Sequence, residues 1–244
     1  MYKYETHMHT SEASKCGSTP AHLYPEYYKK LGYDGIFITD HFFNGNTCIS
    51  RHHTWEERVC LFCHGYENAR QAAEGSGFKV FFGLEYSFGD DEFLLYGIDK
   101  EWLIGHPEIM DCNRESLYSL IHGAGGLMVQ AHPYRERGYI SAIHLSPNYC
   151  DAWEAYNAHN NDIQNANALS FCEQNDIFIT AGSDLHKIGA LSDNSLFGMC
   201  FDNPLQCEAD YVNAILNRRG TPAVPANRIV KPGEIITSTP VIIH

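Results

Sequence analysis

The sequence of 244 residues predicts an α/β fold built on a mostly parallel sheet. Short apolar segments rich in Ile, Val and Phe alternate with helix-like segments, as in proteins whose parallel strands are joined by crossing helices. The apolar segments are nearly continuous, which indicates strands that are covered on both faces. The residues themselves leave open whether the sheet closes into a barrel or stays open.

Seven apolar runs are the expected strands: Tyr2–His7, Gly35–Thr39, Lys79–Glu85, Phe93–Ile98, Gly126–Ala131, Asp151–Tyr156 and Ile177–Ala181. Five helices are expected among them: Ala21–Leu31, Thr54–Glu74, Arg114–His122, Asp162–Gln174 and Leu205–Asn217. No internal repeat or Pro/Gly-rich linker divides the chain, so we expect residues 1–244 to form a single domain. Residues 220–244 contain four prolines and are expected to form an extended C-terminal segment packed on that domain.

The composition argues against two classes of function. With 17 Lys+Arg against 30 Asp+Glu the formal charge is −13, and no basic run offers a surface that neutralises phosphates. We therefore expect no nucleic-acid scaffold role and no binding to anionic membranes. A hydrophobic content of 44% indicates a folded core, and no apolar run approaches the roughly 18 residues of a membrane-spanning helix. The composition does not predict the oligomeric state.

The N-terminal stretch carries Lys3, Glu5 and two histidines where a signal peptide would have an apolar segment. The nine cysteines are scattered and odd in number. We therefore expect a cytoplasmic protein with reduced cysteines and no structural disulfide.

Histidines and carboxylates gather where the expected strands end. His7 and His9 close the first run, and residues two apart on a strand project to the same face. The set of candidate metal ligands is His7, His9, His41, Glu85, His132, Asp184 and His186. In a parallel barrel the C-terminal ends of all strands lie on one rim, so these side chains are expected to converge there.

The candidate ligands are imidazoles and carboxylates, a mixture that suits zinc, manganese or iron. Seven protein ligands exceed the number that one catalytic ion uses. Two or three divalent ions with open positions for water would use them all. The sequence does not choose among the three metals.

The order and spacing of these residues resemble the PHP family, named for polymerase and histidinol phosphatase. The resemblance rests on the motifs His7-Met8-His9-Thr10, Thr39-Asp40-His41, Glu85, Ala131-His132-Pro133 and Ser183-Asp184-Leu185-His186. It implies a distorted (β/α)7 barrel, similar to a TIM barrel, with a trinuclear metal site that hydrolyses phosphoesters. The ligands it implies for the first ion are His7, His9, Glu85 and Asp184. It further implies that Glu85 bridges to a second ion shared with His132, and that His41 and His186 hold a third.

Two positions depart from the family pattern. Many members carry an acidic residue or a histidine shortly after the His-x-His pair, where this chain has Lys15 and Cys16. A lysine is a poor ligand because its ammonium must lose a proton, which leaves a Cys16 thiolate or the nearby Glu12 as alternatives. Members also often place a histidine before the strand that begins here at Phe93. Glu92 is either a carboxylate replacement for that imidazole or a solvated turn residue.

The resemblance implies a phosphoesterase in which a metal-activated hydroxide attacks the phosphorus, so that no protein nucleophile is needed. His186 is a candidate to protonate the leaving group. Arg135 and Asn157 are the candidate substrate-binding residues, with Arg135 as the cationic clamp for phosphate. Arg137 and Lys187 are further candidates for that clamp. The long segment 42–58 is expected to set specificity.

The leading hypothesis is a metal-dependent phosphoesterase acting on a small phosphorylated metabolite or nucleotide. The second is a histidinol-phosphate phosphatase. The third, from another class, is a metal-stabilised binding module without catalytic activity.

Overall fold

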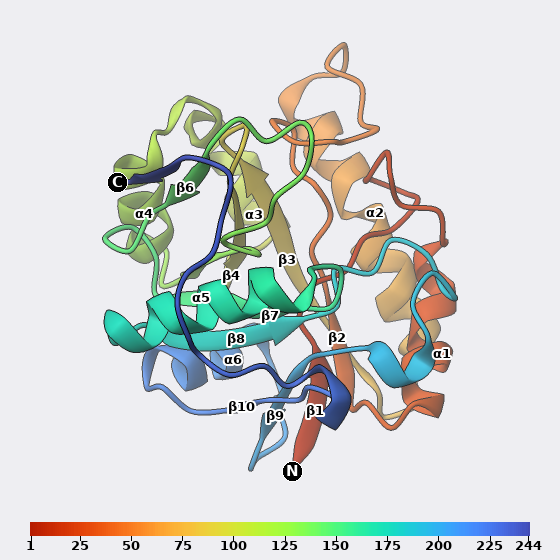
Figure 1. The fold of residues 1–244 in the computed structure, drawn as a ribbon. Helices are drawn as coiled ribbons and strands as arrows, with labels where there is room; N and C mark the ends of the chain where they lie inside the picture. The colour runs from red at the N-terminus through yellow and green to blue at the C-terminus, as the bar shows by residue number, and fades with distance from the viewer.

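A computed structural model describes residues 1–244 and contains a nine-stranded sheet in the order β10-β9-β1-β2-β3-β4-β5-β7-β8. The strands of this sheet are β1 Tyr2–Glu5, β2 Gly35–Ile38, β3 Lys79–Ser87, β4 Glu92–Tyr96, β5 Leu127–Gln130, β7 Ala152–Asn157, β8 Phe178–Gly182, β9 Met199–Phe201 and β10 Thr221–Pro222. Figure 1 shows the sheet curving around itself, with helices outside it. All seven expected strands are present.

The curved sheet turns back on itself so that the segments that follow β1 and β8 meet. The backbone N–H of Asp184 donates to the carbonyl of His7 at 2.7 Å, and the N–H of His9 donates to the carbonyl of Leu185 at 2.9 Å. These bonds join the first and last strands of the seven-strand set and nearly close it into a barrel. The predicted α/β, TIM-like barrel is thus confirmed, with β9 and β10 added outside the seven expected strands.

The barrel departs from a regular (β/α) pattern at β4. This strand runs antiparallel to both β3 and β5, with Glu85 opposite Leu94 and Phe93 opposite Gln130. The turn that reverses the chain is short, and in it the N–H of Phe88 donates to the carbonyl of Asp91 at 2.8 Å. A connection of this length cannot hold a crossover helix, so β4 must pair antiparallel with β3.

The helices cover the outside and one end of the barrel. They are α1 Tyr24–Lys30, α2 Trp55–Ala73, α3 Lys100–Gly105, α4 Arg114–Gly123, α5 Asp162–Gln174 and α6 Glu208–Leu216, with short 3-10 turns η1 Ala21–Leu23, η2 Pro107–Asp111, η3 Asp193–Ser195 and η4 Ala226–Arg228. All five expected helices are present, whereas α3 was not expected. Helix α2 begins with a capping box in which Thr54 and Glu57 exchange hydrogen bonds, which satisfies exposed N–H groups of its first turn.

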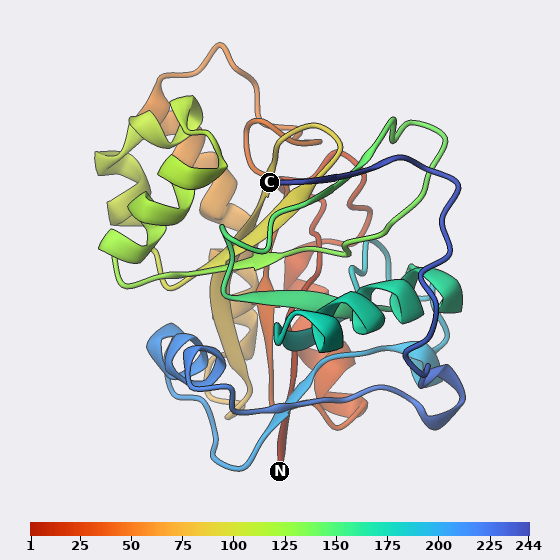
Figure 2. The same ribbon diagram turned by 60° about the vertical axis from the view of Figure 1, so that its left-hand side comes forward.

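Side chains of the barrel strands form the largest buried cluster, which includes Tyr4, Phe37 and Tyr96. Helix α6 contributes Tyr211, whose ring lies 4.6 Å from that of Phe37 and 4.9 Å from that of Tyr96 between centroids. Figure 2 shows α6 near the end of the barrel where β1 begins. The apolar core therefore occupies the N-terminal end of the barrel and leaves the opposite end to polar residues.

The C-terminal residues run across the outside of the fold. In Figure 1 the dark-blue segment passes in front of α5 and ends beside β6, Ile143–Leu145. Its last strand, β11 Val241–Ile243, pairs in parallel with β6, and the N–H of Ile236 donates to the side chain of Asn167 on α5 at 2.9 Å. None of the helices has the length and apolar character needed to cross a bilayer. All nine cysteines are unpaired.

Candidate metal centre

The seven predicted ligands lie together at the C-terminal rim of the barrel, although they come from distant parts of the sequence. They follow β1 (His7, His9), β2 (His41), β5 (His132) and β8 (Asp184, His186), and Glu85 lies near the end of β3. Bridges between strand ends hold them close, because His41 pairs with Glu85 and Met8 pairs with Leu185. Six of the seven residues are buried and His186 is partly buried.

Three of these residues, His7, His9 and Asp184, direct one ligand atom each to a common point, and Glu85 lies beside the two histidines. Nε2 of His7 lies 3.3 Å from Nε2 of His9, and Oδ1 of Asp184 lies 3.4 Å and 3.1 Å from these two nitrogens. The carboxylate of Glu85 approaches the same nitrogens at 3.2 Å and 3.4 Å. Ligands bound to one zinc ion at about 2.0–2.1 Å in a tetrahedron are about 3.4 Å apart. Of the four residues implied for the first ion, His7, His9 and Asp184 are therefore spaced like the ligands of one ion, and Glu85 faces the two histidines through separate oxygens.

Glu85 connects this group to the next. Its Oε1 lies 3.0 Å from Nε2 of His132, and its Oε2 lies 2.7 Å from Nδ1 of His41. One carboxylate thus faces four histidines, two through each oxygen. A carboxylate in this position can bridge two ions.

Glu92, at the start of β4, is the acidic residue whose role the sequence left open. It lies 3.4 Å from Nε2 of His132 and 3.7 Å from Nδ1 of His41, and its side chain is 23% exposed. Ligand atoms of His41, Glu85 and Glu92 lie within 4.8 Å of one another. Glu92 therefore faces the cluster and is not a fully solvated turn residue.

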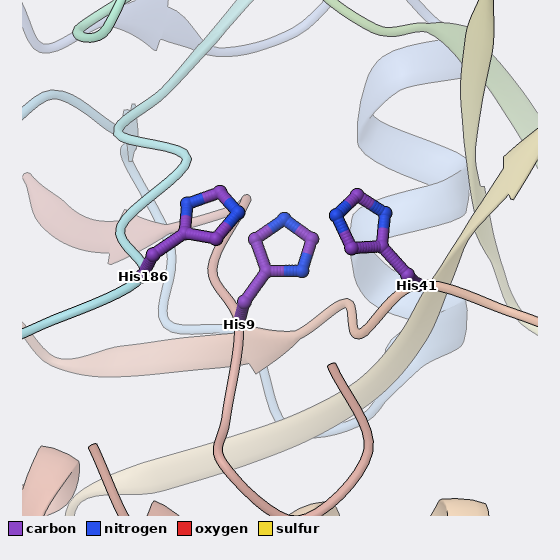
Figure 3. A group of neighbouring side chains, drawn as sticks. All are labelled: His9, His41 and His186. Carbon is purple, nitrogen blue, oxygen red and sulfur yellow. The ribbon is translucent and has the colours of Figure 1, made fainter. Parts of the chain in front are cut away.

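His9, His41 and His186 form a third group of candidate ligands. Figure 3 shows the three rings side by side, with His9 in the middle and each outer ring turning a nitrogen toward it. The ring of His9 lies 4.3 Å from that of His41 and 4.2 Å from that of His186 between centroids. Nδ1 of His186 donates to the carbonyl of Asp184 at 2.8 Å, which leaves the lone pair of Nε2 free for a metal ion.

Two buried atoms in the cluster make no hydrogen bond. Nδ1 of His41 and Oε2 of Glu85 lie 2.7 Å apart, yet their directions do not form a hydrogen bond and no other group donates to or accepts from either atom. A buried polar atom without a partner is rare and costs stability. Two lone-pair atoms that face each other in this way fit ligands of one cation, so the donor set fits divalent ions.

A second layer of side chains orients the histidines. Nδ1 of His7 lies 3.0 Å from Oε1 of Glu154, and Nδ1 of His9 lies 3.0 Å from Oγ of Ser14. The hydroxyl of Ser14 in turn donates to Asp40 at 2.6 Å. These contacts fix the ring nitrogens so that Nε2 of each histidine carries the lone pair, which is the usual device around metal ions.

The backbone at the rim is adapted to this arrangement. His132 has φ 31° and Asp184 has φ 55°, in the left-handed region that non-glycine residues rarely adopt. Such strained positions cluster at functional sites. At Gly182 a side chain would overlap the carboxylate of Glu154 and the Cβ of His7, so this residue must be small for the two side chains to meet.

The electrostatics follow from burying many charges together. Burial alone would raise the pKa of Asp184, but His7 and Arg135 hold it well below its usual range. Burial would likewise raise the pKa of Glu85, but His41 and His7 outweigh the effect of burial and hold the pKa of Glu85 well below its usual range. For Glu92, burial and the adjacent Glu85 raise the pKa to about 8. The site therefore concentrates negative charge that cations would neutralise.

The structure places the predicted phosphate clamp, Arg135, against the cluster and binds it to protein groups. Its guanidinium donates to Asp184 at 2.8 Å, to Asn157 at 2.8 Å and to Asn160 at 2.9 Å. Nη1 makes no hydrogen bond to another protein group. Arg135 thus holds Asp184 in place and keeps one nitrogen for a further partner.

Asn157, the other predicted substrate-binding residue, is fully buried beneath Arg135. Its oxygen accepts from Arg135 and its Nδ2 donates to Glu154 at 2.9 Å. Of the additional candidates for the clamp, Arg137 donates to the carbonyl of His159 at 2.9 Å, and Lys187 is exposed. Substrate binding by these residues stays a prediction.

Sequence reasoning missed three residues that shape the site. Glu154 and Asp40 are buried carboxylates, and such burial is costly unless the fold provides a partner. The signal that could have identified Glu154 is a carboxylate in the interior of an apolar run. The third residue, His159, has a buried, unpartnered Nε2, and its ring lies 6.0 Å from that of His186 between centroids.

The rim cluster defines a candidate multi-ion metal centre on a barrel, and solved structures share this fold. No protein-family model and no curated protein matches the sequence. A structure described as that of a metal-dependent phosphoesterase from Bifidobacterium adolescentis is 18% identical, covering 88% of this chain and 96% of that chain, with a TM-score of 0.54. A two-domain protein from Bacteroides vulgatus that contains a PHP-like metal-dependent phosphoesterase is 16% identical, covering 92% and 65%, with a TM-score of 0.62.

A third structure is the lesion-specific endonuclease Q of Pyrococcus furiosus, which is 13% identical with a TM-score of 0.54. The match covers 91% of this chain and 57% of the endonuclease, so this chain spans little more than half of that protein. At such identities the likeness establishes the fold. The fold implied by the resemblance to the PHP family is therefore confirmed.

The comparison also corrects one expectation. The net charge predicted no nucleic-acid role, but endonuclease Q, with the same fold, has been solved with a duplex whose abasic lesion lies at the active site, at 11% identity and a TM-score of 0.51 over 91% of this chain. That exclusion was wrong because net charge averages over the whole surface. A local cluster of cations at one rim can attract phosphate on an acidic protein.

Proposed function

We propose that the protein is a metal-dependent phosphoesterase. The observation that carries this proposal is the carboxylate of Glu85, which faces His7 and His132 through one oxygen and His9 and His41 through the other. The candidate ligand groups share residues in this way, so two ions bound by them would be neighbours. Closely spaced divalent ions stabilise the entering and leaving oxygens of a phosphoester and lower the pKa of bound water.

The chain's own residues supply orientation and charge around these ions. Arg135 is fixed by Asp184, Asn157 and Asn160, and its remaining nitrogen is placed to donate to a phosphate oxygen. A guanidinium that is already ordered binds an anion without the entropic cost of ordering a free side chain. His186 is the most exposed of the seven candidate ligands, with 27% of its side chain accessible, and in a form whose Nε2 is protonated and holds no ion it is the candidate proton donor to the leaving group.

The substrate we propose is a small phosphorylated metabolite or nucleotide bound through its phosphate. Arg135 is the one arginine that contacts a candidate ligand, and a single clamp suits a terminal phosphate. A phosphodiester in a nucleic acid is the second candidate, because endonuclease Q shares the fold and acts on a duplex with an abasic lesion.

The experiment that tests this proposal is a substrate panel with protein reconstituted in zinc, manganese or iron. The panel contains p-nitrophenyl phosphate, nucleoside monophosphates, histidinol phosphate, bis(p-nitrophenyl) phosphate and an oligonucleotide duplex with an abasic lesion. We expect hydrolysis of monoesters, and loss of that activity in Asp184→Ala. Preferential cleavage of the diester and duplex would favour the second candidate.

A protein that binds two or more ions and hydrolyses none of these compounds would overturn the proposal. If Asp184→Ala then lowered only the melting temperature, the metal-stabilised binding module would be the better account. If the protein preferred histidinol phosphate over the other monoesters, the histidinol-phosphate phosphatase hypothesis would be the better account.

A further inference from the structure

The turn that follows β7, formed by residues 158–160, is fixed by hydrogen bonds along its backbone. Its three N–H groups donate to Gly182 and Asn157 at 2.9–3.1 Å. Its carbonyls accept from the guanidinium groups of Arg137 and Arg228 at 2.9–3.5 Å. The side chains of this turn are therefore held in defined positions at the rim of the barrel.

Two side-chain nitrogens of the turn have no hydrogen-bond partner. Asn160 is only 3% exposed, and its Nδ2 donates to no protein group. Nε2 of His159 is also buried and unpartnered. Buried polar atoms of this kind are rare in folded proteins and costly. An amide nitrogen only donates, and an imidazole can donate through Nε2, so both positions lack an acceptor.

Both side chains lie beside the metal centre. Oδ1 of Asn160 accepts from Nε of Arg135 at 2.9 Å. Because a guanidinium has only donors, this amide cannot be turned over, and its Nδ2 stays beside the guanidinium without bonding to it. The ring of His159 stands at 89° to the ring of His186, with 6.0 Å between centroids. The turn thus sets one unpartnered nitrogen beside Arg135 and the ring that carries the other beside His186.

The missing acceptor has to come from outside the chain. Nη1 of Arg135 also lacks a protein acceptor, so three donor groups are free on this side of the rim. An anion with several oxygens suits them, since one phosphate can accept from an amide, an imidazole and a guanidinium at once. A terminal phosphate has one more free oxygen than a phosphodiester, so three donors favour a monoester.

We propose that Asn160 and His159 are substrate-binding residues that donate to the phosphate oxygens of a monoester beside Arg135. This rests on the proposed function in taking a phosphoester as the substrate. The hydrogen bonds of the turn hold both side chains before the substrate arrives, so binding costs little conformational entropy. Removal of either donor therefore weakens phosphate binding and leaves the metal ions in place.

The test measures the binding of inorganic phosphate to protein loaded with manganese and freed of excess metal, by isothermal titration calorimetry. His159→Phe keeps a ring and removes Nε2 without a change of charge. Asn160→Asp keeps an oxygen for Arg135 and replaces the donor Nδ2 by an acceptor. The matched controls are His22→Phe and Asn203→Asp, because both residues are exposed.

We expect each variant of the turn to bind phosphate about tenfold or more weakly than the native protein, with unchanged metal content, and each control to bind it normally. Native affinity for phosphate in either variant of the turn, or loss of metal along with phosphate, would overturn the proposal. Phosphate binding does not require hydrolysis. A protein that loses phosphate affinity in these variants but cleaves no phosphoester would therefore contradict the proposed function and leave this binding site standing.

Discussion

The imidazole of His7 is fixed by Glu154, whose Oε1 lies 3.0 Å from its Nδ1, while Nε2 of the same ring faces Glu85 and Asp184. The other oxygen of Glu154 accepts from the backbone N–H of His132 at 3.2 Å. One buried carboxylate on β7 thus positions candidate ligands that follow β1 and β5. The metal centre depends on this layer as much as on the ligands themselves.

Replacing Glu154 tests this dependence. Glu154→Ala should weaken metal binding by roughly 10–100-fold, because His7 loses the partner that sets its orientation and tautomer. Glu154→Gln should have a smaller effect, because its amide oxygen can still accept from Nδ1. Competition with a chelator measures the affinities, with the exposed Glu173→Gln on α5 as the control. Equal affinity in Glu154→Ala and the native protein would show that Glu154 does not support the site.

Gly182 should be intolerant of any side chain. A Cβ there would overlap Glu154 and His7, so Gly182→Ala should destabilise the protein by about 1–3 kcal/mol with or without metal. Gly233→Ala is the matched control, because a Cβ at that glycine meets no atom within 4 Å. Urea unfolding of both variants measures the difference. Equal stabilities would mean that the rim can relax around the added methyl group.

Glu92→Gln should have opposite effects on the metal-free and metal-bound protein. Burial and Glu85, whose ligand atom lies within 4.8 Å, raise the pKa of Glu92 to about 8, so folding without metal must either protonate Glu92 or keep two carboxylates charged side by side, and glutamine removes this cost. The metal-free variant should then melt about 2–4 °C higher, equivalent to roughly 1 kcal/mol. The loaded variant should bind one ion less by elemental analysis. A lower melting temperature without metal, together with full metal content, would exclude Glu92 as a ligand.

Arg135→Ala should raise KM for a phosphomonoester by roughly tenfold or more, because the substrate loses a charge-assisted hydrogen bond. The same variant should need more metal for full activity, since Arg135 also holds Asp184 at 2.8 Å. Steady-state kinetics at saturating metal separates the two effects. Arg219→Ala, at an exposed position after α6, serves as the control. An unchanged KM at saturating metal would remove Arg135 from the substrate site.

The sequence was sufficient to predict the elements and the convergence of the ligands, because both depend on local features. Apolar runs mark the strands, and a histidine or carboxylate at the end of such a run marks the rim. The reversed direction of β4 could not be predicted, because an apolar run carries no information about the direction in which a strand enters a sheet. The short turn between Phe88 and Asp91 decides it.

The second layer escaped prediction for a different reason. Glu154 lies within a strand, and the register of β7 shifts between Glu154 and Tyr156. The face to which Glu154 points therefore depends on an irregularity that simple alternation does not reveal. Likewise, the sequence left a Cys16 thiolate and Glu12 as alternatives near the third group, and only the folded loop shows that the carboxylate of Glu12 is directed to the start of η1 and to α2.

The most direct test of the central claim is the hydrolysis of p-nitrophenyl phosphate as metal is titrated into metal-free protein. The metal-free protein should be inactive, and activity should rise as two or more equivalents of divalent metal bind. Glu85→Gln, which alters the carboxylate shared by four histidines, should stay folded and inactive at every metal concentration. Activity that survives removal of metal, or full activity in Glu85→Gln, would contradict a metal centre organised around Glu85.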